Sequence, residues 1–319
     1  MAQDRQNITI AAPAFRGLNT QDSPLTLDAS YASIADNCVI DQYGRIGSRK
    51  GFTAVTSSTT PLGSESLDCI KEYINPTGAN VVLSAGNAKI FTGTTTLTDA
   101  TPASYTINNN NWKMVNFNDH LYIFQLGQEP LIYSSHTGTV EKMSAHAHAT
   151  GTPPQGNEVL AAFGRLWVAD FSADKSTIYW SDLLNGSGWS GGSTGSIDIG
   201  KVWPNGLDEI VALAAHNSFL IVFGKNSIVI YQGAEDPATM SLVDTIANVG
   251  CIGRDTVQST GTDLIFMSSE GLRSFGRTVQ EKSMPVRDIS KNVRTDLLVI
   301  NAAQVNSPIR SIYSPEEAF

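Results

Sequence analysis

The chain has 319 residues, of which 41% are hydrophobic and 16% charged, so it can bury a large core and is too apolar for a disordered chain. Residues 1–60 contain as many basic as acidic side chains, so the formal net charge of −9 belongs to residues 61–319. Such an acidic body argues against sequence-specific nucleic-acid binding, because neutralising phosphates requires clustered Lys and Arg. It is compatible with DNA passing nearby, since an acidic wall repels a polyanion.

The three cysteines, Cys38, Cys69 and Cys251, show no paired spacing, which favours buried thiols in a reducing compartment over a disulfide framework. The N-terminus lacks the apolar core of a signal peptide, and no window resembles a membrane span. We therefore expect a soluble protein that is made in a cytoplasm. Gly, Ser, Thr and Asn are abundant, which favours β structure.

Residues 1–60 precede the first repeat and are predicted to form an N-terminal docking segment. The stretch DASYASIADN at 28–37 predicts a short helix, because Asp28 or Ser30 can cap it and apolar residues recur at helical spacing. Further along, VID and RIG predict a hairpin with Gly44 in its turn.

The main cluster of positive charge in this acidic chain lies in the same hairpin and directly after it. It consists of Arg45, Arg49 and Lys50, and Gly51 then lets the chain turn into FTAVT at 52–56. Taken alone, these glycines and basic residues suggest a phosphate-binding site. The turns of a hairpin explain the glycines better.

Residues 61–319 contain a repeated pattern of β-rich runs separated by short polar turns. Strongly apolar strands start near Val81, Leu121, Leu166, Leu220 and Leu264, and each has a β-rich run before and after it. A period near 40–45 residues with about four strands per unit is typical of a β-propeller blade. We therefore predict an all-β protein, a β-propeller of five units plus the start of another.

Two segments depart from the repeat. Residues 183–206 lengthen the third unit and predict a long Gly/Ser surface loop, on which Trp189 and Trp203 are candidates for exposed partner contacts. Residues 144–158 predict a Pro/Gly connector. A second helix is predicted over 287–299, where apolar residues recur at spacing four.

The last stretch, IRSIYSPEEAF at 309–319, aligns with the first strand of a further unit. We expect the chain to be a fragment of a longer one, with closure of the ring by ITIAA at 8–12 or FTAVT at 52–56 as the alternative.

Several motifs match catalytic patterns by letters alone. GSGWSG at 186–191 matches a dinucleotide loop and GWSGG at 188–192 a nucleophile elbow, but both require a following helix that the sequence does not predict. WSDLLNGSGW at 180–189 resembles a sialidase aspartate box, but Leu184 stands where the Asp belongs. We expect no enzymatic activity.

Potential metal ligands also have simpler explanations. His146 and His148 are two apart and would share a face of a strand, but they lie in a connector that we interpret as solvated. The acidic pairs Asp208–Glu209, Glu235–Asp236 and Glu316–Glu317 are expected in solvated turns. No metal site, catalytic residues or cofactor are predicted.

Residues 17–52 resemble the opening of the tail nozzle proteins of short-tailed bacteriophages, also called tail tubular protein B or tail stabilisation proteins. The stretches 203–233 and 249–275 also look like this family. The N-terminal positions that carry the resemblance are Gly17, Leu18, Asn19, Ser23, Pro24, Leu25, Asn37, Gly44, Arg49, Gly51 and Phe52.

The resemblance implies a structural virion protein. Such nozzles form a homohexameric ring below the tail adaptor, continue the channel through which the genome leaves, and help to hold tail fibres. We therefore expect the protein in the virion tail, with itself, the adaptor, a tail fibre protein and passing DNA as partners. On this hypothesis Arg45, Arg49 and Lys50 pair with acidic groups of the adaptor or a neighbouring subunit. A receptor-binding propeller module and a glycan hydrolase remain the alternatives.

Overall fold

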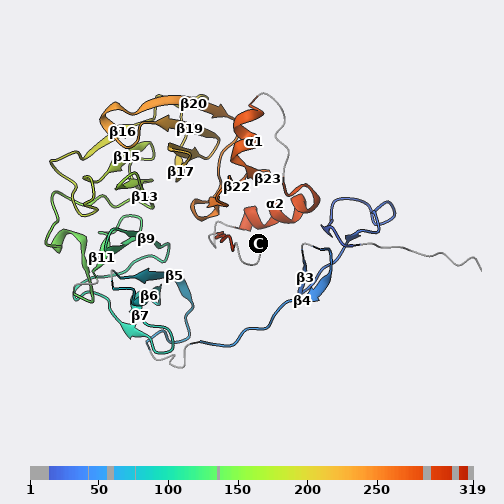
Figure 1. The fold of residues 1–319 in the computed structure, drawn as a ribbon, viewed down its shortest axis with the longest axis horizontal. Coiled ribbons are helices and arrows are strands. Elements are labelled where there is room, and N and C mark those ends of the chain that lie inside the picture. The colour runs from blue at the N-terminus through green and yellow to red at the C-terminus, as the bar shows by residue number, and fades with distance from the viewer. Residues whose placement is uncertain are drawn as a thin grey trace, which may run out of the picture.

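The protein is mostly β-sheet, with several four-stranded antiparallel sheets (Figure 1). The computed structural model describes residues 14–41, 43–55, 61–75, 77–134, 137–282, 289–303 and 309–314. No helix in these ranges is both long and apolar enough to cross a membrane.

Four sheets share one plan, in which each strand pairs with the next along the chain. The first sheet consists of β5 (Leu67–Ile74), β6 (Asn80–Gly86), β7 (Lys89–Thr92) and β8 (Thr98–Asp99). The second sheet consists of β9 (Lys113–Phe117), β10 (His120–Phe124), β11 (Leu131–Ser134) and β12 (Thr139–Lys142). The third sheet consists of β13 (Glu158–Ala162), β14 (Arg165–Ala169), β15 (Thr177–Trp180) and β16 (Gly195–Asp198). The fourth sheet consists of β17 (Ile210–His216), β18 (Phe219–Gly224), β19 (Ser227–Gln232) and β20 (Ser241–Ala247).

A fifth sheet has three strands and is followed by a helix. Its members are β21 (Gln258–Ser259), β22 (Leu264–Ser268) and β23 (Gly271–Ser274), and α1 (Phe275–Gln280) follows directly. The Ser274 side chain caps α1 by accepting a hydrogen bond from the backbone of Arg277. The other helices are η1 (Met143–Ala145), η2 (Pro237–Thr239), η3 (Arg254–Thr256), η4 (Lys291–Val293) and α2 (Arg294–Ala303).

The predicted four-strand repeat is confirmed at the level of strands and sheets. In every unit the apolar run is the second strand of its sheet, and the preceding and following runs are the strands on either side of it. The five sheets follow one another in chain order around an arc (Figure 1).

The second strands that lie between two sheets are mostly apolar because both of their faces are buried. On β10, Leu121 packs in a core shared with the first sheet, whereas Tyr122 packs in a core shared with the third. On β18, Leu220 faces the third sheet and Ile221 faces the fifth. Side chains alternate between the faces of a strand, so a strand between two sheets needs apolar residues on both of its faces. Each such side chain contributes about 1.5–3 kcal/mol by burial.

The N-terminal part contains two small sheets. β1 (Gly17–Leu18) pairs in parallel with β2 (Tyr31–Ala32), and β3 (Cys38–Ile40) pairs with β4 (Ile46–Ser48) in an antiparallel hairpin. This hairpin lies where VID and RIG predict one.

The helix predicted over residues 28–37 is absent, and that prediction was wrong. The Asp28 carboxylate accepts hydrogen bonds from the backbone and the hydroxyl of Ser30, at 2.8 and 2.7 Å. This turn competes with a helix, and Tyr31 and Ala32 then pair with β1. The helix predicted over 287–299 is present in part, because η4 begins at Lys291 and α2 continues to Ala303.

Residues 183–206 are not a detached surface loop. They include β16, the fourth strand of the third sheet. Trp203 is 4% exposed in the core between the third and fourth sheets, and Trp189 is half-buried with its indole N–H directed at the sulfur of Met143. The expectation that both tryptophans are exposed partner contacts was wrong.

Two segments are candidates for closing the ring, and only the second lies mainly within the described residues. ITIAA at 8–12 lies outside the described residues, and residues 52–55 of FTAVT form no strand. Residues 309–314 also form no strand, but the backbone N–H of Ser311 donates to the Asp255 carbonyl at 3.0 Å.

Candidate functional site

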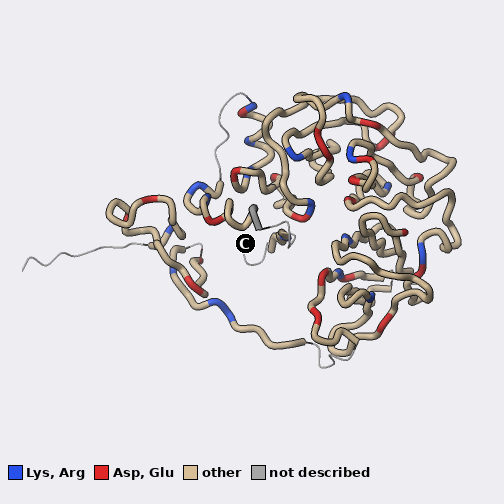
Figure 2. Tube along the Cα trace, turned by 180° about the vertical axis from the view of Figure 1, so that it is seen from behind, with Lys and Arg blue, Asp and Glu red and all other residues tan. Residues whose placement is uncertain are grey.

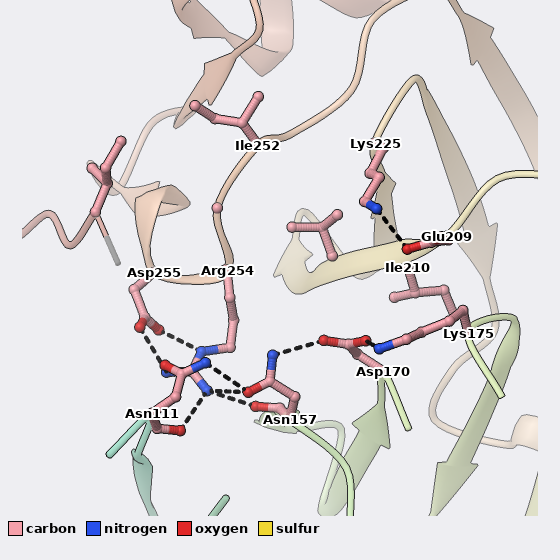
Figure 3. A pocket seen from close by; sticks show the side chains of 13 residues that line it. Asn111, Asn157, Asp170, Lys175, Glu209, Ile210, Lys225, Ile252, Arg254 and Asp255 are labelled. Atoms are coloured by element: carbon pink, nitrogen blue, oxygen red, sulfur yellow. Dashed lines mark hydrogen bonds and ion pairs between the residues drawn. The ribbon is translucent and has the colours of Figure 1, made fainter. Parts of the chain in front are cut away.

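A buried arginine joins three of the five sheets. The Arg254 side chain donates to the Asp255 carboxylate through Nε and Nη2, at 2.9 and 2.7 Å. Nη1 donates to the Asn157 carbonyl at 2.7 Å, and Nη2 donates to the Trp112 carbonyl at 2.9 Å and to Asn111 Oδ1 at 3.0 Å. Asn111 and Trp112 lie just before β9, Asn157 just before β13, and Arg254 in η3 before β21. One guanidinium therefore connects the second, third and fifth sheets (Figure 3).

The hydrogen bonds continue from Arg254 across the third sheet. Asn111 Nδ2 donates to Asn157 Oδ1 at 3.0 Å, and Asn157 Nδ2 donates to Asp170 Oδ2 at 2.7 Å. Asp170 pairs in turn with Lys175. We call this set the polar cluster, and its members are Asn111, Asn157, Asp170, Lys175, Arg254 and Asp255.

A second ion pair lies across a small cavity from the polar cluster. Lys225 and Glu209 of the fourth sheet's turns approach to 2.7 Å, and the cavity between them and the cluster has a volume of about 290 Å³ (Figure 3). Its walls come from loops at the starts of β9, β13 and β17 and from the segment that leads into η3.

A fully buried carboxylate lies next to the polar cluster. Glu158, the first residue of β13, accepts two hydrogen bonds from Lys113 Nζ, at 2.6 and 2.8 Å, and one from the backbone N–H of Leu213 at 3.0 Å. Lys113 begins β9 and Leu213 lies in β17, so Glu158 joins the second, third and fourth sheets. Burial raises the pKa of the Glu158 carboxyl, while the charges of Lys113 and Arg254 oppose that rise.

The pKa of the carboxyl group beside Arg254 is shifted in the opposite direction. Burial alone would raise the pKa of Asp255, but the hydrogen bond and charge of Arg254 outweigh it and hold the pKa below its ordinary value. Asp255 is therefore a stable anion beside a permanent cation.

The cavity beside the polar cluster is lined mainly by amide and charged side chains. The residues that line the cavity include no hydroxyl, thiol or imidazole, and its ionisable side chains are those of Lys, Arg, Asp and Glu. Its carboxylates each pair with a Lys or Arg. Within the described ranges, no group of three or more His, Cys, Asp or Glu side chains could hold a metal ion.

The three basic residues predicted as a docking cluster lie on the exposed N-terminal part, far from the polar cluster. The Arg45 side chain pairs with Asp41 at 2.7 Å and lies over the ring of Tyr43, with 5.2 Å between its guanidinium carbon and the ring centroid. Arg49 and Lys50 are exposed on the segment that leads to the first sheet, where Figure 2 shows a basic stretch.

The family-like residues build turns in the N-terminal part. Asn19 is buried, and its Oδ1 accepts from the backbones of Gln21 and Asp22 at 3.0 and 3.2 Å. Asn37 (φ 51°) accepts a backbone hydrogen bond from Arg49 at 2.9 Å. The remaining positions form β1, the loop after it, the hairpin turn and its exit, and they are Gly17, Leu18, Ser23, Pro24, Gly44, Gly51 and Phe52.

The two connector histidines gather with a third. The ring centroids of His120 and His146 are 4.9 Å apart, and those of His146 and His148 are 5.6 Å apart. With Tyr122 they line a cavity of about 500 Å³ beside the loop that contains Asn185. The interpretation of the connector as wholly solvated was therefore wrong for His146, which is half-buried.

No protein-family model and no curated protein sequence matches the chain. Among solved structures, the extracellular domain of BT4673 from B. thetaiotaomicron is similar at 12% identity over 75% of this chain and 35% of that chain, with a TM-score of 0.38. The extracellular domain of BT3049 from the same organism has 9% identity over 78% and 32%, with a TM-score of 0.45. The computationally designed Ika8 protein has 8% identity over 65% and 57%, with a TM-score of 0.41.

These similarities are too distant to carry an argument about function. The chain spans about a third of the length of the two B. thetaiotaomicron domains and just over half of the designed protein.

Sequence reasoning did not single out Arg254. The stretch that contains it, VGCIGRDTVQ, was recognised only as part of the family-like segment 249–275. An Arg–Asp pair carries no special signal in this sequence, because a second one follows at 287–288. The partners of Arg254 could not be inferred, since they lie in loops of two other units.

Proposed function

We propose that the protein is a structural subunit of the tail nozzle type, whose sheets are blades of a β-propeller and whose copies assemble into a homohexameric ring in a virion tail. It has no enzymatic activity in this proposal. DNA passes through the ring without sequence-specific binding, and the tail adaptor and a tail fibre protein are its further partners.

The observation that carries the proposal is the use of buried charge. Arg254, the centre of the polar cluster, lies in the family-like segment 249–275 and is committed to holding three sheets together. A subunit that must keep its shape under load benefits from such connections, whereas an enzyme requires charged groups directed at a substrate. The resemblance of residues 17–52 supports the specific assignment to a nozzle.

The decisive test is the mass and shape of the purified full chain. We expect six copies per particle by mass photometry, and a sixfold ring with an axial hole by electron microscopy. A monomer that appears as a solitary disc would contradict the nozzle and favour a binding module. Hydrolysis of a glycan that is lost on substitution of one carboxylate would contradict a purely structural role.

The basic cluster offers a test at single residues. Replacing Arg49 and Lys50 by Glu should weaken ring assembly or docking to the adaptor, because acidic partner groups would then face like charges. The control is Lys142→Glu, a charge reversal within the second sheet. Unchanged assembly together with reduced DNA retention would show that the two residues contact DNA instead.

A further inference from the structure

We propose that the N-terminal arm, defined as residues 14–55, docks on the first sheet of a second copy of this chain, with Phe52 and Val55 as its apolar anchors. The inference deepens the proposed function and rests on it for the closed ring. The arm leaves the arc of sheets and stands apart from it (Figure 1).

The arm has no apolar core of its own. Among its described residues only Asn19 and Ser30 are buried, and both are polar. Large apolar side chains are open to solvent instead: Leu25 is 96%, Phe52 is 88% and Val55 is 70% exposed. Isolated exposed apolar residues are ordinary, but a whole segment without a buried one is not a stable unit by itself. The arm therefore requires a surface to cover it.

The first sheet has an exposed face that carries apolar side chains and an acidic one. Tyr73 of β5 packs towards the second sheet, so the alternate residues Ile70, Glu72 and Ile74 lie on the opposite face. Ile70 is 63% and Ile74 is 59% exposed, and the acidic Glu72 lies between them.

Charge selects a second copy as the partner. Arg49 and Lys50 lie three and two residues before Phe52, and residues 61–319 carry the entire net charge of −9. An arm with basic residues near an aromatic anchor complements a face on which the carboxylate of Glu72 lies between two exposed isoleucines.

Contacts at the other end of the arm argue against docking on its own first sheet. The Thr20 backbone N–H donates to the Asn292 carbonyl at 2.9 Å, and its hydroxyl donates to Asp296 at 2.7 Å. Gln21 Oε1 accepts from Thr295 at 2.9 Å. These bonds fix the arm to the region of α2, at the opposite end of the arc from the first sheet. An arm and an acceptor on different faces make a head-to-tail contact, which closes into a ring when the rotation allows.

The experiment uses the full chain and two double variants. The arm variant is Phe52→Ser with Val55→Ser, and the face variant is Ile70→Ser with Ile74→Ser. The control is Leu207→Ser, which removes an equally exposed side chain (89%) from a loop of the body. We expect each double variant to weaken self-association by about 30-fold or more, as truncation of interface anchors does, and the control to leave it unchanged. Circular dichroism establishes that every variant is folded.

Mixing the two double variants tests the head-to-tail arrangement directly. The face variant keeps an intact arm, and the arm variant keeps an intact face. One arm–face contact can therefore still form between a molecule of each variant. We expect heterodimers in the mixture, and monomers of each variant alone. Folded variants that fail to form heterodimers would overturn the proposal.

The outcomes separate this proposal from the nozzle assignment. A sixfold ring that survives both double variants overturns arm docking and leaves the nozzle standing. A wild-type oligomer of another symmetry that dissociates in the arm variant supports arm docking and contradicts the hexameric nozzle. A wild-type chain that stays monomeric at all concentrations overturns arm docking.

Discussion

Arg254 connects parts of the chain that are distant in sequence. Its partners Asn111 and Asn157 lie 143 and 97 positions earlier. Arg254→Met removes the cation and its hydrogen bonds and leaves the partly buried Asp255 with Arg310 at 3.6 Å as its cationic neighbour, so we expect the free energy of unfolding to fall by about 2–4 kcal/mol. Urea titration measures the change. The control is Arg277→Met at an exposed position, with an expected change within about 0.5 kcal/mol. Equal effects of the two substitutions would contradict a structural role for the polar cluster.

His146 gives the protein a response to mild acid. Burial lowers the pKa of its imidazole from 6.5, and nearby His148 lowers it further, while Glu141 opposes them. A histidine with a lowered folded pKa contributes stability that is complete above the unfolded value and is lost as the pH falls through the folded value. We therefore expect the melting temperature to decrease between about pH 7.5 and about pH 5.

The variant His146→Asn identifies the source of this decrease. It keeps an acceptor near Ser187 and removes the proton site, so its melting temperature should depend less on pH. His216→Asn, at the end of β17, removes a histidine outside the cavity and should retain the decrease. An NMR titration that places the pKa of His146 above 6.5 would contradict the expected sign.

At the scale of elements, Gly44 determines how the arm hairpin packs. Its φ is +76°, and a Cβ there would lie 2.4 Å from the Cβ of Ala14 and 2.8 Å from the carbonyl oxygen of Phe15. Gly44→Ala therefore combines a backbone penalty of about 1–2 kcal/mol with a clash. Gly78→Ala is the matched control, because φ is +82° and nothing lies within 4 Å of its added Cβ.

Hydrogen exchange measures the local effect of both substitutions. We expect faster exchange of β3 and β4 in Gly44→Ala, and faster exchange confined to the β5–β6 turn in Gly78→Ala. If β3 and β4 exchange equally fast in the two variants, the contact between the hairpin and residues 14–15 does not stabilise the arm.

The strands were predictable because their signal is local. A strand buried on both faces, such as β10 or β18, is apolar along most of its length, and that run is visible in the sequence. The helix at 28–37 was not predictable in the same way, because the Asp28 side chain forms a local turn that competes with the helical pattern.

The site was much less predictable than the strands. Arg45, Arg49 and Lys50 attract attention as a run of charge, whereas Arg254 is a single residue whose partners come from two loops far away in the sequence. Which loops meet depends on how successive sheets stack, and this is decided by packing over the whole chain rather than by spacing. Trp203 illustrates the same limit, because only the packed fourth sheet shows that it is buried.

At the scale of the molecule, the apolar cores join each sheet only to its neighbours. The first and second sheets share one core, and the fourth and fifth share another. Nearest-neighbour packing of this kind allows one end of an array to open without the other. The polar cluster adds a connection of a different kind, because Arg254 joins the fifth sheet directly to the second and third.

This difference predicts how the protein unfolds. With Arg254 in place, opening the fifth sheet must also break contacts with two distant sheets, so the wild type should unfold in one transition with similar protection in β10, β14 and β22. In Arg254→Met the fifth sheet keeps the core that it shares with the fourth but loses the guanidinium contacts with the second and third, so β22 should exchange through a partial opening of lower free energy, ahead of β10 and β14. Native-state hydrogen exchange at increasing urea measures this directly. Loss of protection by the same amount in all three strands would mean that Arg254 stabilises the molecule without coupling its ends.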